Sequence, residues 1–143
     1  MPPYRQMLVA IDLTEQSQAI AVKSIELARQ WQAQLRLLHV IEFVPVEPMS
    51  DALVPVMQID DQLIARARQQ ISELAVTLGL PADSCRVATG NVKGEILRQA
   101  RETGADLIVL GARERHGLSI LVNLTEDTVL HGAPCDVLAM RVR

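Results

Sequence analysis

Five short runs of consecutive apolar residues, separated by segments with a helical period, constrain the fold of this chain more than any other feature. The runs lie at residues 7–11, 35–41, 85–88, 107–110 and 137–142. An unbroken apolar run indicates a strand covered on both faces, which is typical of parallel sheets. Because the runs alternate with helices, the pattern predicts an α/β, Rossmann-like fold: an open five-stranded parallel sheet with helices on both faces.

The segments between the runs predict four helices. Their apolar residues recur every three or four positions, and residues that favour helix ends flank them. The expected ends are, in chain order, Thr14 before the first helix, Gly79 after the second at 59–78, Asn91 and Gly104 around the third, and Gly132 with Pro134 after the fourth at 125–130.

Right-handed crossovers between parallel strands leave few possible topologies. The strong runs at 7–11 and 107–110 belong near the centre, and the weak run at 85–88 suits an edge. We therefore expect the strand order 3-2-1-4-5, in a single domain over residues 1–143. Residues 43–57 contain three prolines and are too long for a plain turn, so we interpret them as a surface flap over the sheet's carboxyl edge.

Composition disfavours several classes of protein. The net charge is −3 and only Tyr4, Trp31 and Phe43 are aromatic, whereas nucleic-acid binders usually carry basic surfaces and stacking platforms. No stretch reaches the roughly 18 apolar residues of a membrane span. The start of the chain lacks a signal peptide, so we expect a cytoplasmic protein. Cys85 and Cys135 lack metal or redox spacing and are expected to be buried free thiols.

A ligand in such a sheet binds at the carboxyl ends of the strands, where the strand order reverses. Here that point lies between the first and fourth strands, which deliver residues 12–15 and 111–117. Asp12 is placed either to accept hydrogen bonds from an adenine amino group or a ribose hydroxyl, or to accept backbone N–H groups of the next turn. Thr14 suits a helix cap better than a ligand contact. Gly111 either allows close backbone approach to a ligand or is a plain turn glycine.

The chain resembles the universal stress protein family in five segments that occur in order. They are MLVAIDLT at 7–14, LLHV at 37–40, GNVKGEI at 90–96, ADLIVLG at 105–111 and VLHGAPCDVL at 129–138. The resemblance implies a cytoplasmic homodimer of the expected fold, formed through the last strand. The interface residues would be Val137, Leu138, Ala139, Met140, Arg141 and Val142. An exposed apolar edge strand also invites pairing on physical grounds.

The resemblance also implies a nucleotide site, because many members bind ATP with a Gly-x-x-Gly loop followed nine residues later by Gly-Ser or Gly-Thr. It places Asp12 near adenine and the backbone of Val40 against the base. The remaining site would be lined by Gly111, Arg113, Asn123, Leu124 and Thr125.

This chain departs from that loop at two positions. Glu114 stands at the second glycine and Leu124 at the later one. Glycines let successive N–H groups turn toward phosphates, whereas Leu124 obstructs that approach and Glu114 adds negative charge. Asn123 and Arg113 offset part of this loss. We therefore expect weak or absent ATP binding.

The motifs favour a binding or regulatory protein over an enzyme. The sequence holds no Gly-x-Ser-x-Gly and no Walker lysine motif, and Glu114 with His116 lacks a third metal ligand. His39 is interpreted as a satisfied core residue. We expect a non-enzymatic stress-response or regulatory homodimer; the alternative is an adenine-nucleotide sensor for ATP or AMP, or a slow ATPase.

Overall fold

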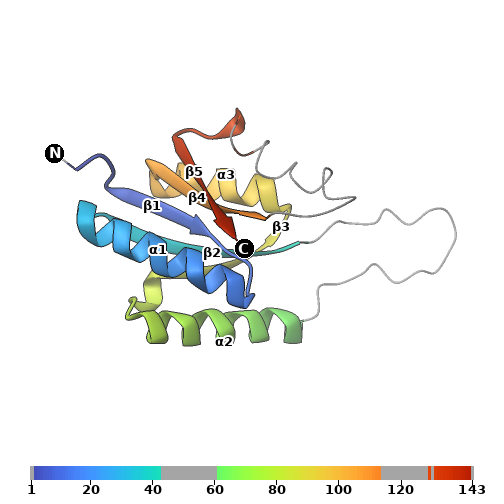
Figure 1. The fold of residues 1–143 in the computed structure, drawn as a ribbon. Coiled ribbons are helices and arrows are strands. Elements are labelled where there is room, and N and C mark those ends of the chain that lie inside the picture. Colours follow the sequence, from blue (N-terminus) through green and yellow to red (C-terminus); the bar gives the residue numbers. More distant parts are fainter. Residues whose placement is uncertain (1, 43–60, 114–128, 130, 143) are drawn as a thin grey trace, which may run out of the picture.

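The computed structural model describes residues 2–42, 61–113, 129 and 131–142, which form a sheet with helices packed on both faces (Figure 1). The strands are β1 (Gln6–Ala10), β2 (Gln34–Glu42), β3 (Cys85–Gly90), β4 (Leu107–Arg113) and β5 (Asp136–Val142). The helices are α1 (Glu15–Trp31), α2 (Asp61–Leu78), α3 (Val92–Thr103) and the short 3₁₀ helix η1 (Ala82–Ser84). No described helix is long and apolar enough to cross a membrane.

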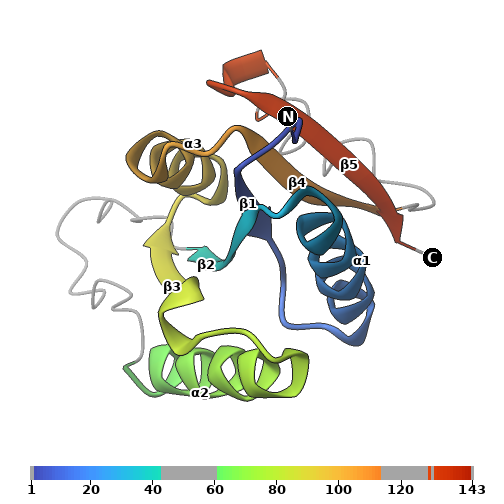
Figure 2. The same cartoon turned by 90° about the vertical axis from the view of Figure 1, so that its left-hand side faces the viewer.

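The sheet confirms the predicted topology. All four strand pairs are parallel, and the order is β3-β2-β1-β4-β5. Viewed along the strands, β1 lies in the middle, with β3 and β5 at the two edges (Figure 2). The weak third run and the fifth run are therefore the edge strands, as expected.

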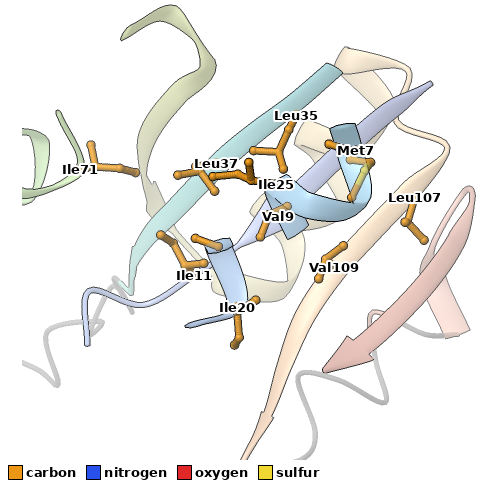
Figure 3. Close-up of a cluster of buried hydrophobic side chains, with 12 residues drawn as sticks. Met7, Val9, Ile11, Ile20, Ile25, Leu35, Leu37, Ile71, Leu107 and Val109 are labelled. Atoms are coloured by element: carbon orange, nitrogen blue, oxygen red, sulfur yellow. The ribbon is translucent and has the colours of Figure 1, made fainter. Parts of the chain in front are cut away.

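Two apolar layers hold the sheet because successive side chains of each strand point to opposite faces. On β1, Met7 and Val9 pack with α1 and α2, whereas Leu8 packs with α3 on the other face. The side chains of the α1 and α2 layer converge on β1, β2 and β4 (Figure 3). The unbroken apolar runs thus reflect burial on both sides.

Local capping confirms the predicted starts of the first and third helices and the predicted end of the third. The Thr14 hydroxyl accepts the Ser17 N–H, and the Asn91 Oδ1 atom accepts the Gly94 N–H at 2.9 Å. Gly104 closes α3 in the left-handed conformation at φ 63°. The predicted flap at 43–57 and most of the fourth helix lie outside the described residues. Residues 129, 131 and 132 are helical, so this helix continues two residues past its predicted end at 130 and includes Gly132.

The fourth strand is longer than its apolar run predicts. Gly111, which we considered either as a site of close backbone approach to a ligand or as a plain turn glycine, lies inside β4 together with Arg113. Backbone pairing with β5 continues to Arg113 opposite Val142, so the ladder holds β4 extended after the apolar side chains end. Gly111 is also absent from the glycines with positive φ, and the turn interpretation is therefore wrong.

Candidate functional site

The carboxyl edge of the sheet has a step at its centre. The pairing of β1 with β4 ends at Val9, and its pairing with β2 ends at Ala10. The neighbouring strands continue, β2 to Glu42 and β4 to Arg113. After β1 the chain therefore leaves the sheet between the longer strands β2 and β4. This is the point where the strand order reverses and where such folds bind ligands.

Asp12 lies directly beyond this step and is held by the start of α1. Its Oδ1 atom accepts the Thr14 N–H at 3.2 Å and the Thr14 hydroxyl at 2.5 Å. The Ser17 hydroxyl donates to the same oxygen. Ser17 is buried, with 5% of its surface exposed, so this carboxylate fixes both the loop and the first turn of the helix.

These contacts confirm one of the two roles considered for Asp12. The carboxylate accepts a backbone N–H of the next turn, and Thr14 is the N-cap of α1. A negative charge here also suits the positive end of the helix. Contact of Asp12 with an adenine amino group or a ribose hydroxyl remains a prediction, and such a ligand would have to share the carboxylate with Thr14 and Ser17.

A hollow of about 300 Å³ adjoins Asp12, between the start of α1 and the middle of α2. Its polar lining comprises Asp12, Thr14, Gln18, Gln70, Glu73 and Thr77. Within the described part of the chain, two carboxylates and no basic side chain line it. A phosphate group would be repelled here, whereas neutral groups that donate hydrogen bonds are suited to these acceptors.

Val40 lies on β2 beside the step, half-buried, with its side chain in the α3 layer. Val40 pairs with Ala88 of β3, whereas the pairing of β2 with β1 ends two residues earlier, at Leu38. The backbone of Val40 is thus beside the end of β1, where the resemblance places the base.

The phosphate side of the predicted site is described only in part. Gly111 and Arg113 occupy β4, opposite Met140 and Val142 of β5. The residues Asn123, Leu124 and Thr125, as well as Glu114, lie outside the described residues. Their roles stay predictions from the sequence.

The predicted dimer strand β5 forms an edge of the sheet. Leu138 and Met140 pack against the α1 and α2 layer, and Val137 against the α3 layer. Ala139 and Arg141 are exposed. Within the described part of the chain β5 pairs with β4 only, so its outer backbone edge is open.

The two cysteines are free and half-buried rather than fully buried. Burial raises the pKa of the Cys85 thiol. Burial, together with the carboxylates of Asp106 and Asp136, raises the pKa of Cys135. Both thiols are therefore protonated at neutral pH. Among the described residues, no three His, Cys, Asp or Glu side chains are grouped to hold a metal ion.

A larger hollow, of about 600 Å³, lies at the opposite edge of the sheet. It is lined by the last turns of α1 and α2 and by η1, including Ile25, Arg29, Leu78 and Asp83. This edge carries the amino ends of the strands, so it is separate from the step beside Asp12.

Sequence reasoning missed the part that His39 plays. Its Nδ1 atom lies 2.9 Å from the carbonyl oxygen of Ile11, at the end of β1. The half-buried ring is a satisfied residue, as expected, but its partner is the backbone immediately before Asp12. The apolar run around His39 carried no signal for this long-range contact.

Comparison with known proteins agrees with this architecture. A model of the universal stress protein family matches residues 3–141. Universal stress protein A homolog 2 of Coxiella burnetii is 35% identical over 144 residues, covering 100% of this chain and 99% of the relative. Universal stress protein A homolog 1 of the same organism is 33% identical and covers 96% of each chain.

Solved structures give the same result. The universal stress protein UspA from Lactobacillus plantarum matches with a TM-score of 0.66 and 28% identity, over 98% of both chains. A universal stress protein in complex with cAMP matches with a TM-score of 0.66 over 96% of both chains; at 18% identity, this likeness shows the fold alone. The family match spans nearly the whole chain, and the chain therefore belongs to the universal stress protein family.

Proposed function

We propose that this chain is a non-enzymatic stress-response or regulatory protein of the cytoplasm that acts as a homodimer and binds ATP weakly or not at all. The observation that most directly supports weak or absent ATP binding is the acidic character of the hollow beside Asp12. Asp12 and Glu73 line it, and none of its lining residues in the part of the chain that the structure describes is basic. A triphosphate would bring further negative charge to this part of the molecule.

The sequence of the phosphate loop supports the same proposal. Glu114 and Leu124 replace the two glycines that ATP-binding members use. A branched side chain at the later position obstructs the close approach of backbone N–H groups to phosphate.

Calorimetric titration with ATP tests this part of the proposal. The unaltered protein is expected to bind more weakly than about 100 µM, which corresponds to roughly −5.5 kcal/mol. A double substitution, Glu114→Gly with Leu124→Gly, is expected to gain affinity. Binding by the unaltered protein below about 10 µM, roughly −7 kcal/mol, would contradict the charge argument.

The open edge of β5 supports a homodimer. Peptide groups on an edge strand pair readily with a second strand, and the exposed side chain of Ala139 lies in the middle of β5. Sedimentation equilibrium is expected to give a dimer that Ala139→Asp weakens, because symmetry sets like charges near one another. Val76→Asp, on an exposed position of α2, is the matched control. A monomer at micromolar concentration would refute the dimer.

An adenine-nucleotide sensor or slow ATPase is the second candidate. Two observations favour it: the backbone of Val40 lies beyond the end of the β1 ladder, and one structural neighbour was solved with cAMP. Titration with adenosine, AMP and cAMP separates binding of the nucleoside end from binding of phosphates. Phosphate release from ATP above the uncatalysed rate would favour the ATPase over the sensor.

A further inference from the structure

The hydrogen-bond ladder between β1 and β2 ends with a side chain in the place of a backbone donor. The Ile11 N–H donates to the Leu38 carbonyl at 2.9 Å, so the backbone of β1 is still in register at that point. In a continuing parallel ladder, the Ile11 carbonyl would next accept the Val40 N–H. The register instead ends at Ala10 opposite Leu38.

The side chain of His39 takes the place of that missing backbone donor. Its Nδ1 atom lies 2.9 Å from the Ile11 carbonyl oxygen. A carbonyl oxygen only accepts, so Nδ1 carries the proton and donates. The imidazole thus satisfies the last carbonyl of β1.

The consequence falls on the next residue, Val40. Peptide groups of a strand alternate in direction with a period of two residues. Because Leu38 bonds toward β1, the N–H and C=O of Val40 also point to the β1 side, where the chain has already turned away to Asp12. Among the described residues, no contact takes the Val40 N–H, although buried backbone groups are normally paired.

We propose that His39 is a positioning residue that keeps the Val40 peptide groups available to a ligand by occupying the Ile11 carbonyl. The inference rests on the adenine-nucleotide candidate described above. It identifies His39 as the residue that leaves the Val40 peptide groups free to bind the base. Without the imidazole, the Ile11 carbonyl lacks this donor, and the Val40 N–H is the donor that a continuing ladder in this register would bring to it.

The adenine base, which the resemblance already places against the backbone of Val40, fits the two groups that this residue presents. One N–H donor and one C=O acceptor on the same side of a strand match a ring with an acceptor nitrogen next to an amino group. Adenine carries this pair on both hydrogen-bonding edges, N1 or N7 beside the 6-amino group. A neutral base also avoids the repulsion that phosphate meets near Asp12 and Glu73.

Hydrogen exchange of backbone amides tests the ladder without any ligand. In the unaltered protein, the Val40 amide is expected to exchange at least tenfold faster than the Leu38 amide. In His39→Leu, its exchange is expected to slow at least tenfold as it pairs with the Ile11 carbonyl. His39→Asn, whose amide nitrogen can replace Nδ1, should keep the fast exchange. Equal protection of Val40 and Leu38 in the unaltered protein would overturn the inference.

Binding of adenosine tests the ligand. His39→Leu is expected to weaken adenosine binding at least tenfold, while His39→Asn stays within about threefold and the melting temperatures of all three proteins remain similar. Unchanged adenosine affinity in His39→Leu would overturn the positioning role. If the exchange pattern is as expected but the unaltered protein binds no adenosine, adenine is wrong as the ligand and the nucleotide-sensor candidate fails with it.

Discussion

The carboxylate of Asp12 and the hydroxyl of Ser17 provide a quantitative test of whether Asp12 is built into the fold. Replacing Asp12 with Ala removes the acceptor of the buried Ser17 hydroxyl and of both Thr14 donors. A hydrogen bond to a charged group contributes about 1.5–3 kcal/mol, and the more exposed contacts with Thr14 add about 1 kcal/mol. We expect Asp12→Ala to lower the free energy of unfolding by about 3 kcal/mol.

Ser17→Ala alone is expected to cost about 2 kcal/mol, because it removes one bond from the same carboxylate. The double variant should lose only about 3 kcal/mol, since the bond between the two side chains can be lost only once. The expected coupling energy is therefore about 2 kcal/mol. A role for Asp12 in ligand binding alone predicts no coupling in the ligand-free protein.

Urea unfolding followed by circular dichroism measures all four proteins of this cycle. The stability change of Asp12→Ala should also lower the melting temperature by about 10 °C for a domain of this size. Coincident fluorescence and circular dichroism transitions are needed for a two-state treatment. Strictly additive losses, with a coupling below about 0.5 kcal/mol, would refute the reasoning.

Three further predictions concern the core, the start of β1 and the cysteines. Ile108→Ala, at a fully buried position, should cost about 2–5 kcal/mol in urea unfolding, whereas Val76→Ala, at a position 81% exposed, should change stability by less than about 0.5 kcal/mol. Asp106 accepts the N–H groups of residues 5 and 6 at 2.8 and 2.9 Å. Asp106→Ala should therefore lower the free energy of unfolding by about 2 kcal/mol, and Asp106→Asn by about half of that. Equal losses in the two variants would contradict a charge-assisted contact. Because the pKa values of Cys85 and Cys135 are raised, both should react with a thiol reagent at pH 7 more slowly than free cysteine, and faster as the pH rises.

Much of the fold follows from short-range pattern. The caps at Thr14 and Asn91 satisfy N–H groups three residues ahead, so the sequence contains both partners within one turn. The strand order follows from where the apolar runs are strongest, because central strands are buried on both faces. The local role of Asp12 was likewise one of the two alternatives that the sequence offered, because its hydrogen-bond partners are two and five residues away.

Other features depend on partners that are distant in sequence. The extension of β4 through Gly111 comes from backbone pairing with β5, and backbone pairing leaves no mark on side-chain pattern. The contact of His39 joins residues that are 28 positions apart, and nothing in an apolar run marks which carbonyl will lack a donor. Hydrophobic periodicity therefore located the candidate site but not the groups that shape it.

The central place of β1 has a consequence during translation. Gln6 and Asp106, bonded where β1 meets the β4 segment, are 100 residues apart. At about 5–20 residues per second, the ribosome needs roughly 5–20 s to supply that partner. During this interval the backbone edge of β1 that will pair with β4 has no partner strand. Nascent chains on neighbouring ribosomes expose the same unpaired edge. Chaperone capture should therefore be strongest before Leu107–Val109 leave the exit tunnel and should fall once they do.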